Sequence, residues 1–335
     1  MYLVTGGGGF IGSHIVERLV GMGEKVRVLD NFSSGRIENL LGLMDKIDLV
    51  LGDLLEQTVV RKAMEGIEVV FHEAALRSVP LSVENPALVN RVNVEGTVNI
   101  LVAARDAGVR RVVYASSSSV YGNTTVLPKS EHQLPSPVSP YAVSKLSGEY
   151  YLKVFAELYG LETVSLRYFN VFGTRQDPTS QYASVIPRFI HWAYRGNPLE
   201  VHGDGLQSRD FTYIDNVVSA NLQAAHSWKG IGSVFNVGQG KAYTLLDLVD
   251  LLQEILGRDL HLLHTAERPG DVRHTLADIS EAEYCLDYQP QVSFEEGIAR
   301  TLKYFNGQGA AAAESRLTGS NDPTNTVNPS AILRR

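Results

Sequence analysis

The sequence predicts an α/β protein, a doubly wound parallel sheet followed by a smaller α/β lobe. Over the first half of the 335 residues, short β-branched apolar runs alternate with longer segments of helical periodicity, a pattern typical of βαβ units. A glycine-rich turn directly follows the first run, and prolines and glycines interrupt shorter segments after Asn170. The expected strands are Tyr2–Thr5, Lys25–Leu29, Ile47–Leu51, Val69–His72, Arg111–Ala115 and Thr163–Arg167.

These patterns divide the chain into two lobes and a tail. We expect residues 1–168 to form the domain that holds the parallel sheet, parts of 209–236 to return to it, and 169–305 to form mainly a substrate-binding lobe. Residues 306–335 are largely Gly, Ala, Ser, Asn, Thr and Pro. Because such residues bury too little apolar surface to offset the entropy of ordering, the tail is predicted to be disordered.

Charge and composition favour a small-molecule partner. The formal net charge is −7, so the chain lacks the broad basic footprint of a nucleic-acid-binding protein. No apolar run reaches the ~18 residues that cross a bilayer, and the N-terminus does not read as a signal peptide. The single cysteine, Cys285, excludes an internal disulfide. We expect a cytoplasmic protein without membrane or nucleic-acid partners, and we predict no metal site.

The segment Thr5–Gly12 has the context of a dinucleotide-binding turn, because it follows a strand and opens a helix. Gly6 permits the tight turn, Gly9 leaves room for the pyrophosphate, and Gly12 allows close packing of helix on strand. Such a loop alone could be an ordinary surface turn. An acidic residue about 20 positions later, Asp30, favours the dinucleotide-binding interpretation and a Rossmann-type sheet.

Asp30 also predicts which dinucleotide binds. At the end of the second strand, its carboxylate can accept hydrogen bonds from both ribose hydroxyls and would repel a 2′-phosphate, so NAD is favoured over NADP. The nearby Arg36 is an argument in the other direction. Asp53, after the third strand, has two interpretations: a hydrogen bond to the adenine amino group, or a cap for the helix that follows.

A possible hydride-transfer set follows further along the chain. Tyr141 and Lys145 are spaced by one helical turn, so both side chains lie on one face of a helix. A lysine cation close to the phenol favours the phenolate and makes Tyr141 a usable general base. Upstream, Ser117 lies in a run of four serines at the carboxyl end of an apolar strand, where open α/β folds bind ligands. The alternative interpretations are a chance pair on a helix surface and a loop-forming serine run.

Taken together, these motifs resemble those of the extended short-chain dehydrogenases/reductases over roughly residues 1–305. The resemblance also rests on His72–Ala75 and Asn93–Thr97, which occur in the same order as in that superfamily. Three further motifs, Leu166–Gly173, Ser208–Phe211 and Arg268–Asp271, are similar to those of nucleotide-sugar 4-epimerases of the NAD-dependent epimerase/dehydratase family. Within that family the best fit is to the 4-epimerases of UDP-glucose and UDP-N-acetylglucosamine.

The resemblance implies a set of site residues. The catalytic residues would be Ser117, Tyr141 and Lys145. The cofactor NAD would contact Gly6, Gly9, Phe10, Ile11, Gly12, Asp30, Asn31, Ser33, Gly35, Asp53, Leu54, Ala74, Ala75, Arg77, Asn93, Ala115, Tyr141, Lys145 and Tyr168. The UDP-sugar would contact Ser117, Ser118, Tyr141, Asn170, Ser184, Val185, Val201, His202, Arg209, Arg268, Asp271 and Thr275.

Within this set, the resemblance assigns individual roles on the substrate side. Asn170 and Arg209 would hold the diphosphate, and Arg268 and Asp271 would hold phosphate and the uridine ribose, since arginine forks pair with phosphate and carboxylates accept from vicinal hydroxyls. Thr275 occupies the position that gates the sugar pocket. Its modest size leaves room for N-acetylhexosamines, although a threonine there also resembles UDP-glucuronate 4-epimerases.

The implied reaction is an inversion at C4 of the sugar through a transient 4-keto sugar and bound NADH. A 4,6-dehydratase would need carboxylates where this chain has Ser118 and Ser119, and a uronate decarboxylase would have Glu in place of Ser119. A non-catalytic NAD-binding regulator could dispense with the catalytic set, whose three members are all present. By analogy we also expect a homodimer, formed by helices near 88–107 and 141–159.

Overall fold

The computed structural model describes residues 1–178, 184–267 and 272–317, with no side-chain description beyond residue 306. Its centre is one sheet of seven parallel strands in the order β11-β6-β5-β4-β1-β2-β3. The strands of this sheet are β1 (Tyr2–Thr5), β2 (Val26–Asp30), β3 (Ile47–Leu51), β4 (Val69–His72), β5 (Arg111–Ser117), β6 (Glu162–Tyr168) and β11 (Ser233–Val237). The six predicted strands are therefore present, within two residues of the expected bounds, and the Rossmann-type fold is confirmed.

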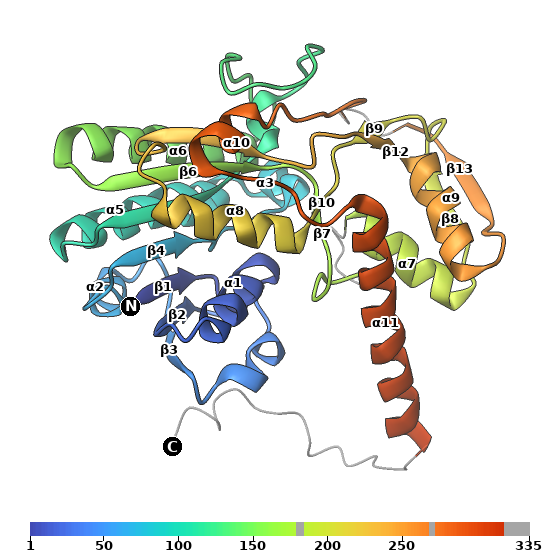
Figure 1. The fold of residues 1–335 in the computed structure, drawn as a ribbon, viewed down its shortest axis with the longest axis horizontal. Coiled ribbons are helices and arrows are strands. Elements are labelled where there is room, and N and C mark those ends of the chain that lie inside the picture. The colour runs from blue at the N-terminus through green and yellow to red at the C-terminus, as the bar shows by residue number, and fades with distance from the viewer. Residues whose placement is uncertain (179–183, 268–271, 318–335) are drawn as a thin grey trace.

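Helices cover both faces of the sheet (Figure 1). On one face lie α1 (Phe10–Gly21) and α8 (Ile214–His226), which pack against each other. On the other lie α2 (Gln57–Ala63), α5 (Gly96–Asp106) and α6 (Pro140–Tyr159), which pack side by side. Ahead of α5, the chain forms α3 (Val79–Glu84), α4 (Pro86–Asn90) and a single π-helical turn (Arg91–Glu95).

Strand alternation explains the two separate apolar layers. In β1, Val4 belongs to the core under α1 and α8, whereas its neighbour Leu3 belongs to the core under α5 and α6. The same division separates Val113 from Val112 in β5. Because successive side chains of a strand point to opposite faces, continuous apolar runs are needed when both faces are covered. This is why β1, β4 and β5 contain continuous apolar runs, whereas β6 carries Thr163, Ser165 and Arg167 at alternate positions.

The C-terminal lobe has three small two-stranded sheets in place of a single large one. The strand pairs are β7 (Val171–Phe172) with β10 (Thr212–Tyr213), β9 (Ser208–Arg209) with β12 (Tyr243–Thr244), and β8 (Leu199–His202) with β13 (Leu262–Thr265). Its helices are α7 (Val185–Arg195), α9 (Leu245–Leu256) and α11 (Phe294–Leu317), whereas α10 (Ser280–Leu286) packs against β11 and α8 of the large-sheet domain. Between these elements, α8 and β11 return to the large sheet, where β11 pairs with β6.

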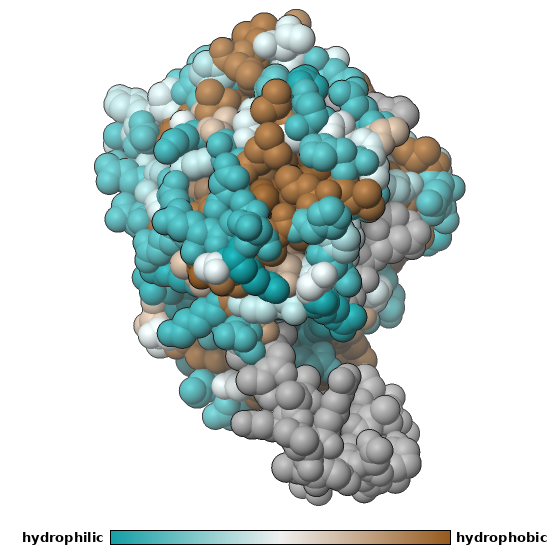
Figure 2. All heavy atoms as spheres, turned by 90° about the vertical axis from the view of Figure 1, so that its right-hand side faces the viewer, coloured by the Kyte–Doolittle hydropathy of each residue, from teal (hydrophilic) through white to brown (hydrophobic). Residues whose placement is uncertain are grey.

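Figure 2 looks onto the side of the molecule where this lobe lies and shows hydrophobic residues gathered within a mainly hydrophilic surface. Exposed large apolar side chains of the lobe include Leu206, Ile255 and Leu263. No helix of the described residues is long and apolar enough to span a membrane.

Helix α11 extends beyond the residue at which the disordered tail was predicted to begin. Helix α11 continues through residue 306 to Leu317 before the described part of the chain ends. The run Ala310–Ala313 accounts for the difference, because alanine has the highest intrinsic helix propensity and can extend a helix that is already nucleated. Residues 318–335 lie outside the described residues.

Candidate active site

The glycine loop is built so tightly that side chains cannot replace its glycines. Gly6 adopts a φ of +67°, its N–H donates to the Leu29 carbonyl at 2.8 Å, and its own carbonyl accepts from the Gly9 N–H at 2.9 Å. A Cβ on Gly12 would lie 2.3 Å from the Gly6 carbonyl oxygen. Helix α1 then begins at Phe10 without a side-chain cap, which leaves N–H groups at its start for an anion.

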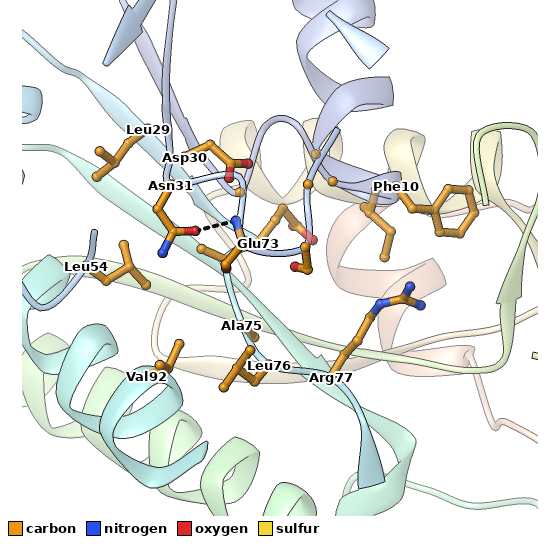
Figure 3. A pocket seen from close by; sticks show the side chains of 18 of the residues that line it. Phe10, Leu29, Asp30, Asn31, Leu54, Glu73, Ala75, Leu76, Arg77 and Val92 are labelled. Carbon is orange, nitrogen blue, oxygen red and sulfur yellow. Dashed lines mark hydrogen bonds between the residues drawn. The ribbon is translucent and has the colours of Figure 1, made fainter. Parts of the chain in front are cut away.

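Asp30 lies directly beside this loop (Figure 3). Its carboxylate accepts hydrogen bonds from the Gly8 N–H at 2.8 Å and the Phe32 N–H at 2.7 Å. Burial raises the pKa of Asp30, while the hydrogen bonds from Phe32 and Gly8 act in the opposite direction. Asp30 thus holds the loop in place and also lines the cavity where the sequence predicts the adenosine ribose.

Asp53 does not cap the helix that follows it. Helix α2 begins at Gln57 with Glu56 as its N-terminal cap residue, three positions after Asp53. One Asp53 oxygen accepts from the Leu55 N–H at 2.9 Å and the other from the Asn31 amide at 2.7 Å. The capping interpretation is therefore wrong, and the position of Asp53 in the cavity wall is compatible with the adenine interpretation.

One continuous cavity, here called the cofactor cavity, runs along the carboxyl ends of β1, β2 and β4. Most of the predicted cofactor residues line it: Gly6, Gly9, Phe10, Ile11, Gly12, Asp30, Asn31, Ser33, Gly35, Asp53, Leu54, Ala74, Ala75 and Arg77. These residues fit NAD, because the loop offers a cradle that a Cβ would fill and Asp30 offers a carboxylate at the ribose position.

Asn93 is the exception among these predictions, because it does not line either cavity of the catalytic region. Its side chain is buried, accepts from the Leu76 N–H at 2.8 Å and donates to the Leu76 carbonyl and to the Ser144 hydroxyl at 3.0 Å. Since its amide is fully engaged by protein groups, Asn93 ties the wall after β4 to helix α6 and does not face the cofactor.

The catalytic set comes together where β5 and α6 meet. Helix α6 is capped by Ser139, whose hydroxyl accepts from the Ala142 N–H at 3.2 Å, and Pro140 occupies its first position. A Cβ on Gly148 would lie 2.3 Å from the Tyr114 hydroxyl, so this glycine lets α6 approach β5 closely. The Lys145 ammonium consequently reaches the Ala115 carbonyl at 2.7 Å.

Ser117, Tyr141 and Lys145 line a second cavity, here called the catalytic cavity, together with Ser118, Ala115 and Tyr168. Burial raises the pKa of Tyr141, and the neighbouring Ser117 hydroxyl and the Arg77 charge lower it. Burial lowers the pKa of Lys145 to about 8, while the charges of Glu73 and Glu149 raise it. The site therefore places a phenol and an easily deprotonated ammonium at the same wall.

The substrate side is assembled from separate segments. Asn170, Ser184, Arg209 and Thr275 line the catalytic cavity. Asn170, Ser184 and Arg209 also line a third cavity, here called the distal cavity, to which Val185 and His202 contribute. Arg268 and Asp271 lie outside the described residues.

Val201 was predicted to line the nucleotide pocket, and this prediction was wrong. Its side chain is fully buried in the apolar core, while the next residue, His202, lines the distal cavity. Both belong to β8, where neighbouring side chains point to opposite faces, so only one of the two can face the pocket.

The sequence analysis missed two candidate functional residues, Glu73 and Lys129. Glu73 lines both the cofactor and the catalytic cavity, and its place in the His72–Ala75 motif was the available signal. Lys129 lines the catalytic cavity although the residue is only 1% exposed, and its ammonium donates to the Gly122 carbonyl at 3.1 Å. No sequence pattern distinguishes Lys129 from an ordinary loop lysine.

The cofactor and catalytic cavities share part of their walls, including Ile11, Ala75 and Arg77. A dinucleotide that began at Asp30 and crossed the glycine loop would end beside Tyr141 and Lys145. This arrangement defines a dinucleotide-dependent enzyme of the short-chain dehydrogenase/reductase type.

The comparison with protein families agrees with this class. Residues 2–238 match the model of the NAD dependent epimerase/dehydratase family, and the chain belongs to that family. The UDP-glucose 4-epimerase of Mycolicibacterium smegmatis is 40% identical over 310 residues, which cover 91% of this chain and 98% of that protein.

Solved structures of similar proteins extend the comparison. A UDP-N-acetylglucosamine 4-epimerase from Methanobrevibacter ruminantium, in complex with UDP-N-acetylmuramic acid, has a TM-score of 0.88 at 41% identity and covers 92% of this chain and 98% of its own. The UDP-glucuronic acid 4-epimerase of Bacillus cereus, in complex with UDP-glucuronic acid and NAD, has a TM-score of 0.85 at 33% identity. The match covers 92% of this chain and 99% of that chain. The predicted family, the isomerase class and the cofactor NAD are confirmed.

Proposed function

We propose that this enzyme inverts the configuration at C4 of a UDP-sugar. The observation that carries the proposal is the shared wall of the cofactor and catalytic cavities, with Ser117, Tyr141 and Lys145 beside it. NAD supplies the acceptor that takes a hydride from the sugar and later returns it. Because the cofactor is regenerated, the reaction has no net redox change.

Each catalytic residue has a distinct task in this proposal. Tyr141 takes the proton from the sugar 4-hydroxyl and gives it back after inversion, which makes it the general base and then the general acid. Ser117 holds the reacting oxygen, since its hydroxyl lies at the end of β5 in the same cavity. Lys145, fixed by the Ala115 carbonyl, places positive charge where the phenolate needs it.

The distal cavity is the proposed site of the UDP group. Asn170 and Arg209 line both this cavity and the catalytic cavity, so they stand where a diphosphate joins a nucleoside to a sugar. The Arg209 guanidinium also donates to the carbonyls of Ser208 and Arg273, at 2.9 and 3.1 Å. A UDP group anchored there leaves the 4-keto sugar free to turn over and present its other face.

Thr275 supports the choice of UDP-glucose, UDP-N-acetylglucosamine or both as substrates. The residue lines the catalytic cavity and is 8% exposed, and its hydroxyl lies 3.4 Å from the Asn170 side chain. A side chain of this size leaves more room for an acetamido group than an aromatic ring would. UDP-glucuronate is the second candidate, which the similarity to the B. cereus epimerase favours.

The proposal is tested by incubating the purified protein, without added cofactor, with UDP-glucose, UDP-N-acetylglucosamine and UDP-glucuronate in separate reactions. Proton NMR then gives the configuration at C4. We expect an equilibrium mixture of C4 epimers with at least one substrate, and the fastest reaction identifies the preferred sugar. A 4-keto-6-deoxy product, or a net build-up of NADH, would show that the enzyme is a dehydratase or a dehydrogenase.

We also propose that the protein is a homodimer. The outer face of α6 exposes Val143, Tyr150, Val154 and Leu158, with 50%, 57%, 41% and 70% of their surfaces accessible. These residues recur along one helix, so they form an apolar stripe suited to a second copy. We expect the Val154→Glu/Leu158→Glu variant to sediment as a monomer, while Leu263→Glu, on the other lobe, stays dimeric. A wild-type monomer would contradict the proposal.

A further inference from the structure

Glu73 occupies the junction between the two halves of the reaction site. Among the described residues that line both the cofactor and the catalytic cavity, it is the only acidic one; the others are Ile11, Ala75, Arg77, Val171 and Ser184. In Figure 3 its side chain points into the cofactor cavity, between Asp30 and Arg77 in this view. A cofactor whose adenosine lies at Asp30 must pass this carboxyl group to reach Tyr141.

A buried chain of hydrogen bonds aims the carboxyl group of Glu73. The Asn221 amide of α8 donates to the Val217 carbonyl at 2.9 Å and to the Tyr168 hydroxyl at 2.8 Å. The Tyr168 hydroxyl, at the end of β6, in turn donates to Glu73 Oε1 at 2.9 Å. Asn221 and Tyr168 are both buried. Tyr168 therefore holds the Glu73 oxygen from β6, and Asn221 holds Tyr168 from α8, so the carboxyl group has a fixed place.

The charged and titratable groups around Glu73 come from several elements. Lys145 faces it from α6 and Tyr168 from β6, while Arg77 follows it on the same segment. His72, at the end of β4, is neutral near pH 7, because burial lowers its pKa to about 3. Burial raises the pKa of Glu73 itself to about 7, against the effects of the Tyr168 hydrogen bond and the Lys145 charge.

We propose that the Glu73 carboxylate is the counter-charge of the cofactor's reactive end, so that it favours the oxidised, cationic nicotinamide over the reduced, neutral one. The inference rests on the proposed function, which places the nicotinamide beside Tyr141 and Lys145. A negative charge held near a cationic ring stabilises that ring by Coulomb attraction, and a partly dehydrated cleft strengthens the effect. The Glu73 carboxylate would thereby favour return of the hydride to the sugar, and the 4-keto sugar would not accumulate.

Binding of the two forms of the cofactor tests this role without any turnover. The dissociation constants of NAD+ and NADH are measured on cofactor-free wild-type protein and on Glu73→Gln, at pH 8. We expect the preference for NAD+ over NADH to fall about tenfold in Glu73→Gln. Glu73→Asp, which keeps the charge, should recover part of the preference, and Glu254→Gln, on the exposed side of α9, should leave it unchanged.

The pH dependence sharpens the test. Because the pKa of Glu73 is raised to about 7, the carboxylate forms as the pH rises through that value, and the preference for NAD+ should rise with it. Lys145 loses its charge nearer pH 8, and the Glu73 charge raises that pKa, so Glu73→Gln would also shift the titration of Lys145. The pH dependence is therefore compared in a Lys145→Met background, with and without Glu73→Gln, where Lys145 no longer titrates. The variant should show no rise of its own near pH 7.

Equal weakening of NAD+ and NADH binding in Glu73→Gln, or an unchanged preference, would overturn the proposal and assign the carboxyl group a purely structural role. This outcome is separate from a failure of the proposed function. If wild-type protein does not epimerise any UDP-sugar but the preference for NAD+ still depends on Glu73, the reaction is wrongly assigned and the role of Glu73 stands.

Discussion

The two halves of the cleft are constructed differently. The cofactor half consists of consecutive strand ends and their loops, held by main-chain hydrogen bonds such as those from Gly6 and Gly9. The substrate half is assembled from Asn170, Arg209 and Thr275, which come from three distant segments. Substitutions in the cofactor half should therefore damage structure and binding together, whereas those in the substrate half should change which sugar reacts.

The largest effect is expected where the halves meet. Tyr141→Phe removes the hydroxyl that exchanges a proton with the sugar, so we expect turnover to fall about 10²- to 10⁴-fold. The NAD content of the purified variant should match that of wild type, because the ring and its packing remain. Turnover is measured by the rate of C4 inversion. A loss of bound NAD alongside the activity would mean that Tyr141 belongs to the cofactor half.

Gly12→Ala tests the cofactor half. The new Cβ would lie 2.3 Å from the Gly6 carbonyl oxygen, so the loop must shift away from the pyrophosphate. We expect NAD to bind at least about tenfold more weakly and unfolding to require about 1–3 kcal/mol less free energy. Gly21→Ala is the matched control in the same helix, because its Cβ meets no atom within 4 Å. Equal behaviour of the two variants would refute the tight-loop argument.

Thr275→Tyr tests the substrate half. An aromatic ring at this wall of the catalytic cavity should exclude the acetamido group, so the ratio of activities on UDP-N-acetylglucosamine and UDP-glucose should fall about tenfold or more. Activity on UDP-glucose and the melting temperature should change little. Thr275→Ser, which keeps the hydroxyl, is the control. Unchanged activity on the N-acetyl sugar would remove Thr275 as the gate.

Lys145→Met should have the smallest effect, an increase in the free energy of unfolding. The pKa of Lys145 is lowered to about 8 in the folded protein, against 10.5 ordinarily, so folding is opposed by the buried charge below pH 8. We expect the inactive variant to be more stable than wild type by on the order of 2 kcal/mol at pH 7. This advantage should shrink as the pH rises from 8 to 10.5 in urea unfolding. A variant less stable at pH 7 would contradict the direction of the shift.

The difference between local and long-range construction also explains which residues of the site could be predicted from sequence. The glycine loop, Asp30 and the Tyr141–Lys145 pair each carry a local pattern, because the structure they require is formed by neighbours in the chain. The structural role of Asp210 could not be predicted from neighbouring residues. Its buried carboxylate accepts hydrogen bonds from the N–H groups of Gln239, Gly240 and Ala277, which lie far along the sequence.

Val201, Asn93 and Glu73 were mispredicted or missed for the same reason, because their orientations depend on contacts with distant segments. The orientation of Val201 depends on which face of a short strand packs against the core, and that of Asn93 on the loop it meets in space. Glu73 stands within a recognisable motif, but its importance depends on Tyr168 and Asn221, which the fold brings to it. Short-range patterns therefore identified most of the residues that line the cavities, while the contacts that orient Val201, Asn93 and Glu73 needed the structure.

Hydride transfer between the two halves is tested most directly with UDP-glucose and UDP-N-acetylglucosamine deuterated at C4. If Tyr141 removes only the hydroxyl proton and bound NAD carries the deuteride, NMR should find the deuterium still at C4 in both epimers after equilibrium is reached. Loss of the label to water, at the rate of epimer formation, would show that inversion proceeds by proton abstraction from carbon and would contradict a reaction through NAD.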